Sequence, residues 1–189
     1  MPFDYTEPEN SIIRREGLSP AIRETLLEST RSEWPEHPRF LGKANFFLNI
    51  HGNLLNGAEQ LAGGLEALLD SPASEVQDAL EASRLKQLGR DLISFAHHHH
   101  EIEDHFYFPQ FTRLFPAMEH AIELLDGDHR VLESALNDTE SGLEALRTRP
   151  ADRDGIARVW KGSRALEKII SRHLWDEEEI IVPIFLQAA

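Results

Sequence analysis

A histidine motif that occurs twice in the sequence places the strongest limit on the fold of this chain. His99 is followed four residues later by Glu103, and His173 is followed four residues later by Glu177. In both copies an acidic residue comes directly after the glutamate, and a proline stands ten residues after the histidine. Residues four apart lie above one another on a helix, so each copy presents an imidazole and a carboxylate on one face. Each copy therefore predicts a helix that carries a pair of metal ligands.

The repeat extends beyond the two motifs. His51 precedes the first motif and His129 precedes the second, and each is followed after thirteen residues by Gly-Leu-Glu-Ala-Leu. This order predicts two helix pairs, each with a lone-histidine helix and a motif helix, that can pack about a pseudo-twofold axis. The alternative is a bundle without metal, whose histidines are solvated or hydrogen-bonded in the core. Because two motifs in register with two lone histidines rarely arise by chance, we favour a metal site whose six ligands are His51, His99, Glu103, His129, His173 and Glu177.

Composition limits the partners and the kind of metal site. The 189 residues suggest one domain with a core of its own. Lys+Arg 19 against Asp+Glu 33 gives a formal net charge of -14, which disfavours nucleic acid and anionic membrane surfaces as partners. Cysteine is absent, which excludes disulfides, thiolate zinc sites and iron-sulfur clusters. The first residues are polar and acidic and no apolar run is long enough for a membrane span, so we expect a cytoplasmic protein.

Helical periodicity predicts an all-α chain. We expect an arm over 1–18, a short helix that begins at Ser19-Pro20 and runs to about Trp34, and then an up-down-up-down four-helix bundle. Residues 1–39 would thus form an N-terminal arm and short helix packed on the bundle, and 40–189 the bundle itself. A loop is expected over 147–154. The four long helices are expected over 40–69, from Ser74 to Pro109, over 117–147 and over 155–186.

These motif residues and their spacing resemble the hemerythrin-like HHE cation-binding family. The resemblance covers the chain from about Phe40 to its C-terminus. It implies a non-haem diiron centre in a four-helix bundle, with two Fe per chain joined by an oxo or hydroxo bridge. Members of the family bind or react with small ligands such as O2, NO or H2O2. A separate electron donor would be needed for turnover, since the sequence carries no flavin or nicotinamide fingerprint.

The donor types agree with iron. Four imidazoles and two carboxylates divide into two sets of two histidines and one carboxylate, which is a ligand type associated with ferrous iron that keeps open positions. Zn or Mn accept similar donors, so the identity of the metal rests on the resemblance. The ferritin-like scheme needs Glu-x-x-His, and no histidine here has a glutamate three positions before it.

Several neighbouring residues have alternative interpretations. His100 with Asp104 is a competing register to His99 with Glu103, while His37, His97, His98, His105 and His120 are expected at the surface. Tyr107 is either a group that acts on a metal-bound oxygen or an aromatic core residue. Asp104 and Glu178 are either acceptors for ligand imidazoles or exposed acids, and we favour exposed acids.

Glu133 marks a departure from the oxygen-carrying members of the family. Those proteins place a second histidine four residues after the helix-three histidine, where this chain has Glu133. Glu133 would either ligate iron or leave the position to solvent, and both outcomes predict rapid oxidation in air and a role in redox chemistry or sensing. The other class of function is an iron-binding sensor or storage module without catalytic turnover.

Overall fold

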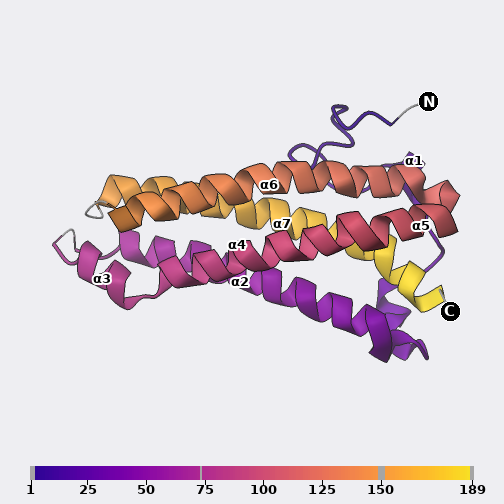
Figure 1. Ribbon diagram of the computed structural model, residues 1–189, viewed down its shortest axis with the longest axis horizontal. Coiled ribbons are helices and arrows are strands. Elements are labelled where there is room, and N and C mark those ends of the chain that lie inside the picture. The colour runs from indigo at the N-terminus through magenta and orange to yellow at the C-terminus, as the bar shows by residue number, and fades with distance from the viewer. Residues whose placement is uncertain (1–2, 73, 149–151, 188–189) are drawn as a thin grey trace. The chain divides into compact units, whose positions relative to one another are not determined.

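The computed structural model describes residues 3–72, 74–148 and 152–187, and within these ranges the chain forms seven α-helices and no strand. Figure 1 follows them from indigo at the N-terminus to yellow at the C-terminus. The α-helices are α1 Pro20–Arg23, α2 Asn45–Leu69, α3 Val76–Ala82, α4 Leu85–Ile102, α5 Phe108–Leu114, α6 Glu119–Thr148 and α7 Arg153–Gln187. The all-helical prediction is confirmed.

The chain divides into two compact units. Unit 1 comprises Met1–Gly52, His100–Val131 and Ser171–Ala189, and unit 2 comprises Asn53–His99 and Leu132–Ile170. Unit 1 therefore holds the N-terminal segment, the first turns of α2, the α5 region, the first part of α6 and the last part of α7. No helix among the described residues combines the length and the apolar character needed to cross a membrane.

The N-terminal segment is less helical than its sequence predicts. Ser19 caps α1 as expected, accepting a hydrogen bond from the backbone N–H of Ile22, but the helix ends at Arg23 and does not continue to Trp34. The hydroxyl of Thr25 donates to the carbonyl of Ile22, and such local bonds from Thr and Ser compete with helix formation. A 3-10 turn at Arg31–Glu36 follows and buries Trp34.

The second predicted helix is interrupted. Arg84 has a φ of 57° and separates α3 from α4, because a left-handed residue cannot continue a right-handed helix. Further on, Glu103–Tyr107 forms a π-helical turn before α5. This wider turn accommodates Pro109, which lacks the N–H that a regular helix would use.

Each unit is held by apolar packing. In unit 1 the buried set includes Trp34 and Phe47 together with apolar side chains of α5, α6 and α7, so the N-terminal segment is part of this core. In unit 2 the helices approach closely at glycine. A Cβ added at Gly64 would lie 2.3 Å from Leu85 Cδ2, and one added at Gly89 would lie 2.3 Å from Leu143 Cδ1.

Candidate metal centre

Three histidine rings of unit 1 are each held by a carboxylate at Nδ1. His129 Nδ1 lies 2.7 Å from Asp104 Oδ1, His173 Nδ1 lies 3.2 Å from Asp128 Oδ2, and His51 Nδ1 lies 3.1 Å from Glu178 Oε1. An ionised carboxylate only accepts hydrogen bonds, so each Nδ1 donates a hydrogen bond to its acid, and Nε2 is the nitrogen of each ring that can bind a metal. This is the arrangement by which proteins orient metal-binding imidazoles.

The Nε2 atoms of His129 and His173 lie close to each other, and all three Nε2 atoms lie near buried glutamates. His129 Nε2 lies 3.2 Å from His173 Nε2 and 3.7 Å from Glu103 Oε2. Glu177 Oε2 lies 3.3 Å from His51 Nε2 and 3.4 Å from His173 Nε2. Two nitrogens at this separation can share one ion, because ligand atoms bonded at about 2.1 Å and at right angles lie roughly 3 Å apart.

The donors of unit 1 form two groups. One contains His51, Glu103 and Glu177, and the other contains His100, His129 and His173; within each group the ligand atoms lie within 4.8 Å of one another. All six side chains are buried. The structure thus brings five of the six predicted ligands together in unit 1, and it adds His100.

The electrostatics of these groups favour positive charge. Burial raises the pKa of Glu103 well above its usual value, and the neighbouring carboxylate of Glu177 raises it further. Burial would lower the pKa of His173, but Glu177 and Asp128 together raise it to about 9. Burial would likewise raise the pKa of Glu177, but His173 and His51 hold it well below its usual value. Two buried carboxylates among imidazoles are compensated well by a divalent cation.

His100 is the residue whose role the sequence reasoning underestimated. His99 and His100 are both buried, and the ring of His100 stacks on that of His129 with centroids 4.2 Å apart. The competing register paired His100 with Asp104, whereas Asp104 contacts His129 instead. The available signal was the helical step of about 100° between neighbours, which allows two of four consecutive histidines to face inward.

The acids next to the motifs are also closer to the site than we expected. The preference for exposed acids at Asp104 and Glu178 is wrong, because Glu178 accepts a hydrogen bond from His51 and Asp104 accepts one from His129. Asp128 was not singled out in the sequence, although it directly precedes His129. Its partners come from distant parts of the chain, so sequence spacing alone gives no signal for them.

The remaining candidates have less direct positions. His99 is the last residue of unit 2 and lies one helical turn before Glu103 along the chain. Glu133 belongs to neither donor group; its side chain is 52% exposed and pairs with His97. Tyr107 packs its ring on Phe111 and Phe185, which agrees with the interpretation as a core aromatic residue.

The other histidines lie at the surface, as expected. The side chain of His120 is 48% exposed and that of His97 is 33% exposed. His37, His98 and His105 are exposed as well.

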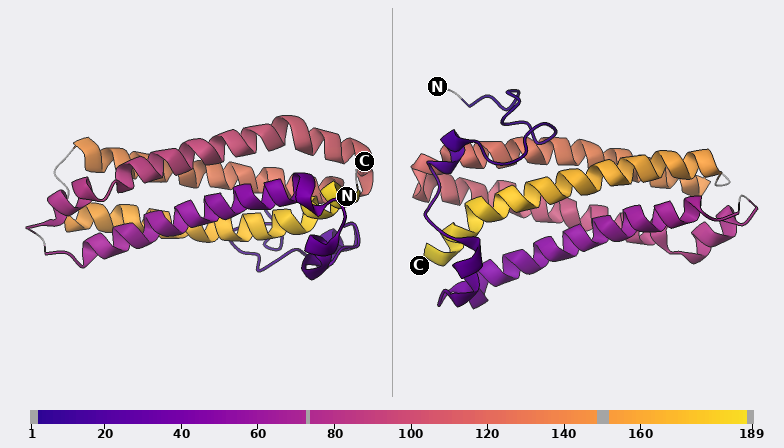
Figure 2. Two further views of the ribbon diagram at one scale, coloured as in Figure 1. Left: turned by 90° about the horizontal axis from the view of Figure 1, so that it is seen from below. Right: turned by 180° about the vertical axis from the view of Figure 1, so that it is seen from behind.

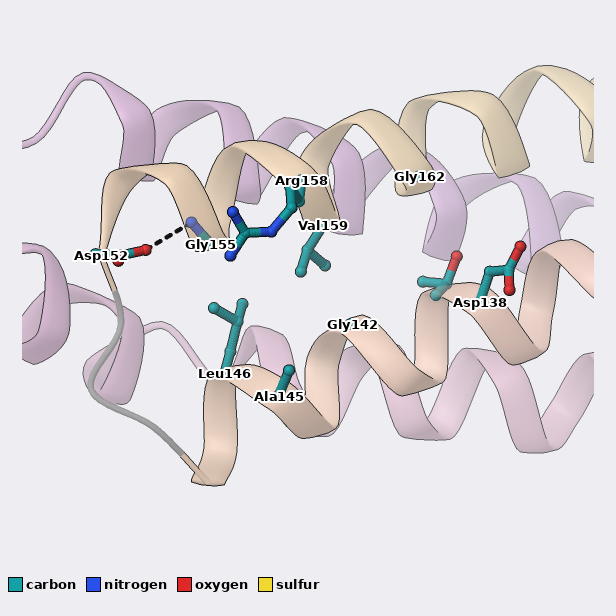
Figure 3. Close-up of a pocket in the computed structure, with 10 residues that line it drawn as sticks. Asp138, Gly142, Ala145, Leu146, Asp152, Gly155, Arg158, Val159 and Gly162 are labelled. Atoms are coloured by element: carbon teal, nitrogen blue, oxygen red, sulfur yellow. Dashed lines mark hydrogen bonds between the residues drawn. The ribbon is translucent and has the colours of Figure 1, made fainter.

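A separate cleft of about 380 Å³ lies within unit 2 between the ends of α6 and α7 (Figure 3). Three glycines form part of its wall, and Asp152 Oδ1 accepts a hydrogen bond from the N–H of Gly155 at the start of α7. Its polar lining consists of Asp138, Thr139, Asp152 and Arg158. These side chains do not include the histidine donors that mark the metal groups of unit 1.

Comparison with known proteins supports the interpretation of the histidine and glutamate groups as a metal centre. The sequence model described as the hemerythrin HHE cation binding domain matches residues 43–185. A search of curated proteins and a search of solved structures returned no match. The matched range contains both motifs, both lone histidines and His100, whereas the N-terminal segment with Arg15 and Arg31 lies outside it.

Proposed function

We propose that this chain, which belongs to the hemerythrin HHE cation-binding domain family, binds two iron atoms and uses them to react with or sense a small ligand such as O2, NO or H2O2. Membership of the family implies metal binding through histidine and glutamate. The pair of irons and the reaction with a diatomic ligand or peroxide are the proposal. We further propose that the chain forms an up-down-up-down four-helix bundle. Its four long members would be α2, α4 together with α5, α6, and α7.

The position of Glu177 carries the proposal. One carboxylate oxygen lies within 3.4 Å of a nitrogen from each donor group, His51 in the first and His173 in the second. Glu103 likewise belongs to the first group and lies 3.7 Å from His129 of the second. Two carboxylates placed between two sets of imidazoles are suited to bridge two metal ions.

The donor set leaves room for a small ligand. The second group supplies three imidazoles from His100, His129 and His173, and the first supplies His51. The motif spacing adds His99, one turn before Glu103 on the helix, as a fifth proposed imidazole. Five nitrogens and two bridging carboxylates fall short of filling two six-coordinate irons, so open positions remain. Iron bound there would supply electron transfer to the small ligand. The protein's own contribution is to hold the imidazole rings in place, to exclude bulk water and to fix the proton of each hydrogen-bonded imidazole at Nδ1.

The ligand assignment is tested by metal content. Protein from iron-supplied cells should contain about two irons per chain, and His173→Ala should lose iron, because its Nε2 lies within reach of Glu177 and His129. His120→Ala is the matched control, since it removes an exposed imidazole. Iron retained at the wild-type level in His173→Ala would overturn the assignment.

The proposed reactivity is tested with oxygen. The carboxylates on three ligand imidazoles raise ligand basicity and so favour ferric over ferrous iron. We therefore expect anaerobically reduced protein to oxidise rapidly in air. Degassing should then fail to restore the ferrous spectrum, whereas full and repeated reversal would indicate an oxygen carrier and contradict the proposed redox or sensing role. Steady-state turnover with a reductant separates a redox enzyme from a sensor or storage module.

A further inference from the structure

The N-terminal segment supplies two arginines that contact the carboxylates behind the metal centre. Arg15 and Arg31 lie before the range matched by the family, 43–185. Both belong to unit 1, in the indigo segment that can be followed past α6 and α7 in Figure 2. Each reaches an acid that also binds a histidine of the site.

Arg15 makes the more buried of the two contacts. Its guanidinium donates to both oxygens of Asp128, and its Nε donates to Asp176 Oδ2 at 2.8 Å. The side chains of Arg15 and Asp128 are 1% and 0% exposed. Tyr5 also donates from its hydroxyl to Asp128 Oδ1 at 2.7 Å. Asp128 in turn accepts from His173 Nδ1, so the segment reaches one ligand histidine through a single carboxylate.

Arg31 makes the equivalent contact on the other donor group. It donates to Glu178 Oε2 and, at 2.8 Å, to Glu179 Oε1. Its guanidinium also lies over two indoles, 4.7 Å from the ring centroid of Trp34 and 4.0 Å from that of Trp175. Glu178 uses its other oxygen for His51 Nδ1. The fixed fork of an arginine is well suited to hold a carboxylate in one orientation.

We propose that Arg15 and Arg31 are positioning residues for the metal centre, and that docking of the N-terminal segment and metal binding stabilise each other. This inference rests on the proposed function, because it assumes that His51 and His173 are ligands. An arginine that fixes a carboxylate also fixes the imidazole that the carboxylate orients. Since coupling between two binding events is reciprocal, a segment that improves metal affinity when docked is itself held more tightly when metal is bound.

The test uses the full-length protein and Arg31→Gln. Arg31 is chosen over Arg15 because the side chain of Arg31 is 27% exposed, whereas that of Arg15 is 1% exposed. Loss of an outer partner of a metal ligand typically weakens metal affinity about 10- to 100-fold. Arg31 holds such a partner, Glu178, and does not contact the imidazole itself, so we expect a loss near the lower end of this range, about 10-fold. The loss is measured by competing ferrous iron with a chelator, and the absorption spectrum of the iron-loaded protein should change as well. Arg31→Lys should recover part of the affinity, because it keeps the charge and loses the fork.

Arg14→Gln is the matched control, since Arg14 is exposed and its substitution changes the net charge equally. Hydrogen exchange over residues 3–39 should slow when iron is added to the wild type and respond less in Arg31→Gln. Equal iron affinity, spectrum and exchange in Arg31→Gln and Arg14→Gln would overturn the inference. The proposed function has its own failure, which is retention of iron by His173→Ala, so the two results are distinguishable.

Discussion

Asp128 joins three parts of unit 1 at a single side chain. Tyr5 and Arg15 of the N-terminal segment donate to it, and so does His173 of α7. Burial would raise the pKa of Asp128, but the hydrogen bonds from Arg15 and His173 hold it below its usual value. The aspartate therefore stays ionised in a buried position and keeps its oxygens available as acceptors.

Removing Arg15 should be costly for this reason. Arg15→Gln removes the arginine partner of the buried Asp128 and leaves it the hydrogen bonds from Tyr5 and His173, whereas Asp176 keeps Arg172. Breaking a buried ion pair from one side typically costs about 3 to 5 kcal/mol. We expect a loss of this size in the free energy of unfolding of the metal-free protein, measured by urea denaturation. The neighbouring Arg14→Gln should change it by less than about 0.5 kcal/mol; a similar small value for Arg15→Gln would show that the buried pair contributes little.

At the scale of elements, the long helices and the motif ligands were predictable, whereas the interruptions were not. The spacing of His99 and Glu103, and of His173 and Glu177, is a local property of a helix and can be read from the sequence. The break at Arg84 depends on a backbone conformation that arginine seldom adopts, so the residue type at this position does not predict the break. Tyr5 and Arg15 each lie more than a hundred residues before Asp128 in the sequence, and only the folded chain brings them into contact with it.

The break between α3 and α4 leads to a stability prediction. Arg84 has a positive φ that costs an L-residue roughly 1 to 2 kcal/mol, while glycine adopts it freely at some cost in unfolded-state entropy. Arg84→Gly should therefore raise the free energy of unfolding by up to about 1 kcal/mol. The same exchange at Arg90, inside α4, should lower it by about 1 kcal/mol. A loss of stability in Arg84→Gly under the same denaturation conditions would contradict the assigned strain.

At the scale of the whole molecule, the two units should respond differently to metal. Apart from His99, the proposed ligands lie in unit 1, whereas the close contacts at Gly64 and Gly89 are made within unit 2. Ligand binding stabilises the part of a protein that holds the ligand. The metal-bound and metal-free states should thus differ mainly in the local stability of unit 1.

Hydrogen exchange measured before and after chelation tests this expectation. Amides over 100–131 and 171–187 should exchange faster after iron is removed, because the buried carboxylates lose their compensating charge. Amides over 54–68 and 132–148, in unit 2, serve as the internal reference and should change little. An equal increase in exchange rate in the ranges of unit 1 and in those of unit 2 would mean that the chain opens as one cooperative unit.

The contacts of Arg15 and Arg31 also bear on where this module begins and ends. The range matched by the family, 43–185, contains every proposed iron ligand, yet a chain cut to that range would carry neither guanidinium. A chain of residues 43–185 would keep the proposed ligands, but Asp128 would lose its contact with Arg15 and Glu178 would lose its contact with Arg31. The residue range matched by the family is thus shorter than the range of residues that contact the proposed site and its acids. Exchange of such domains between proteins should carry the preceding forty or so residues with them if the iron chemistry is to be transferred intact.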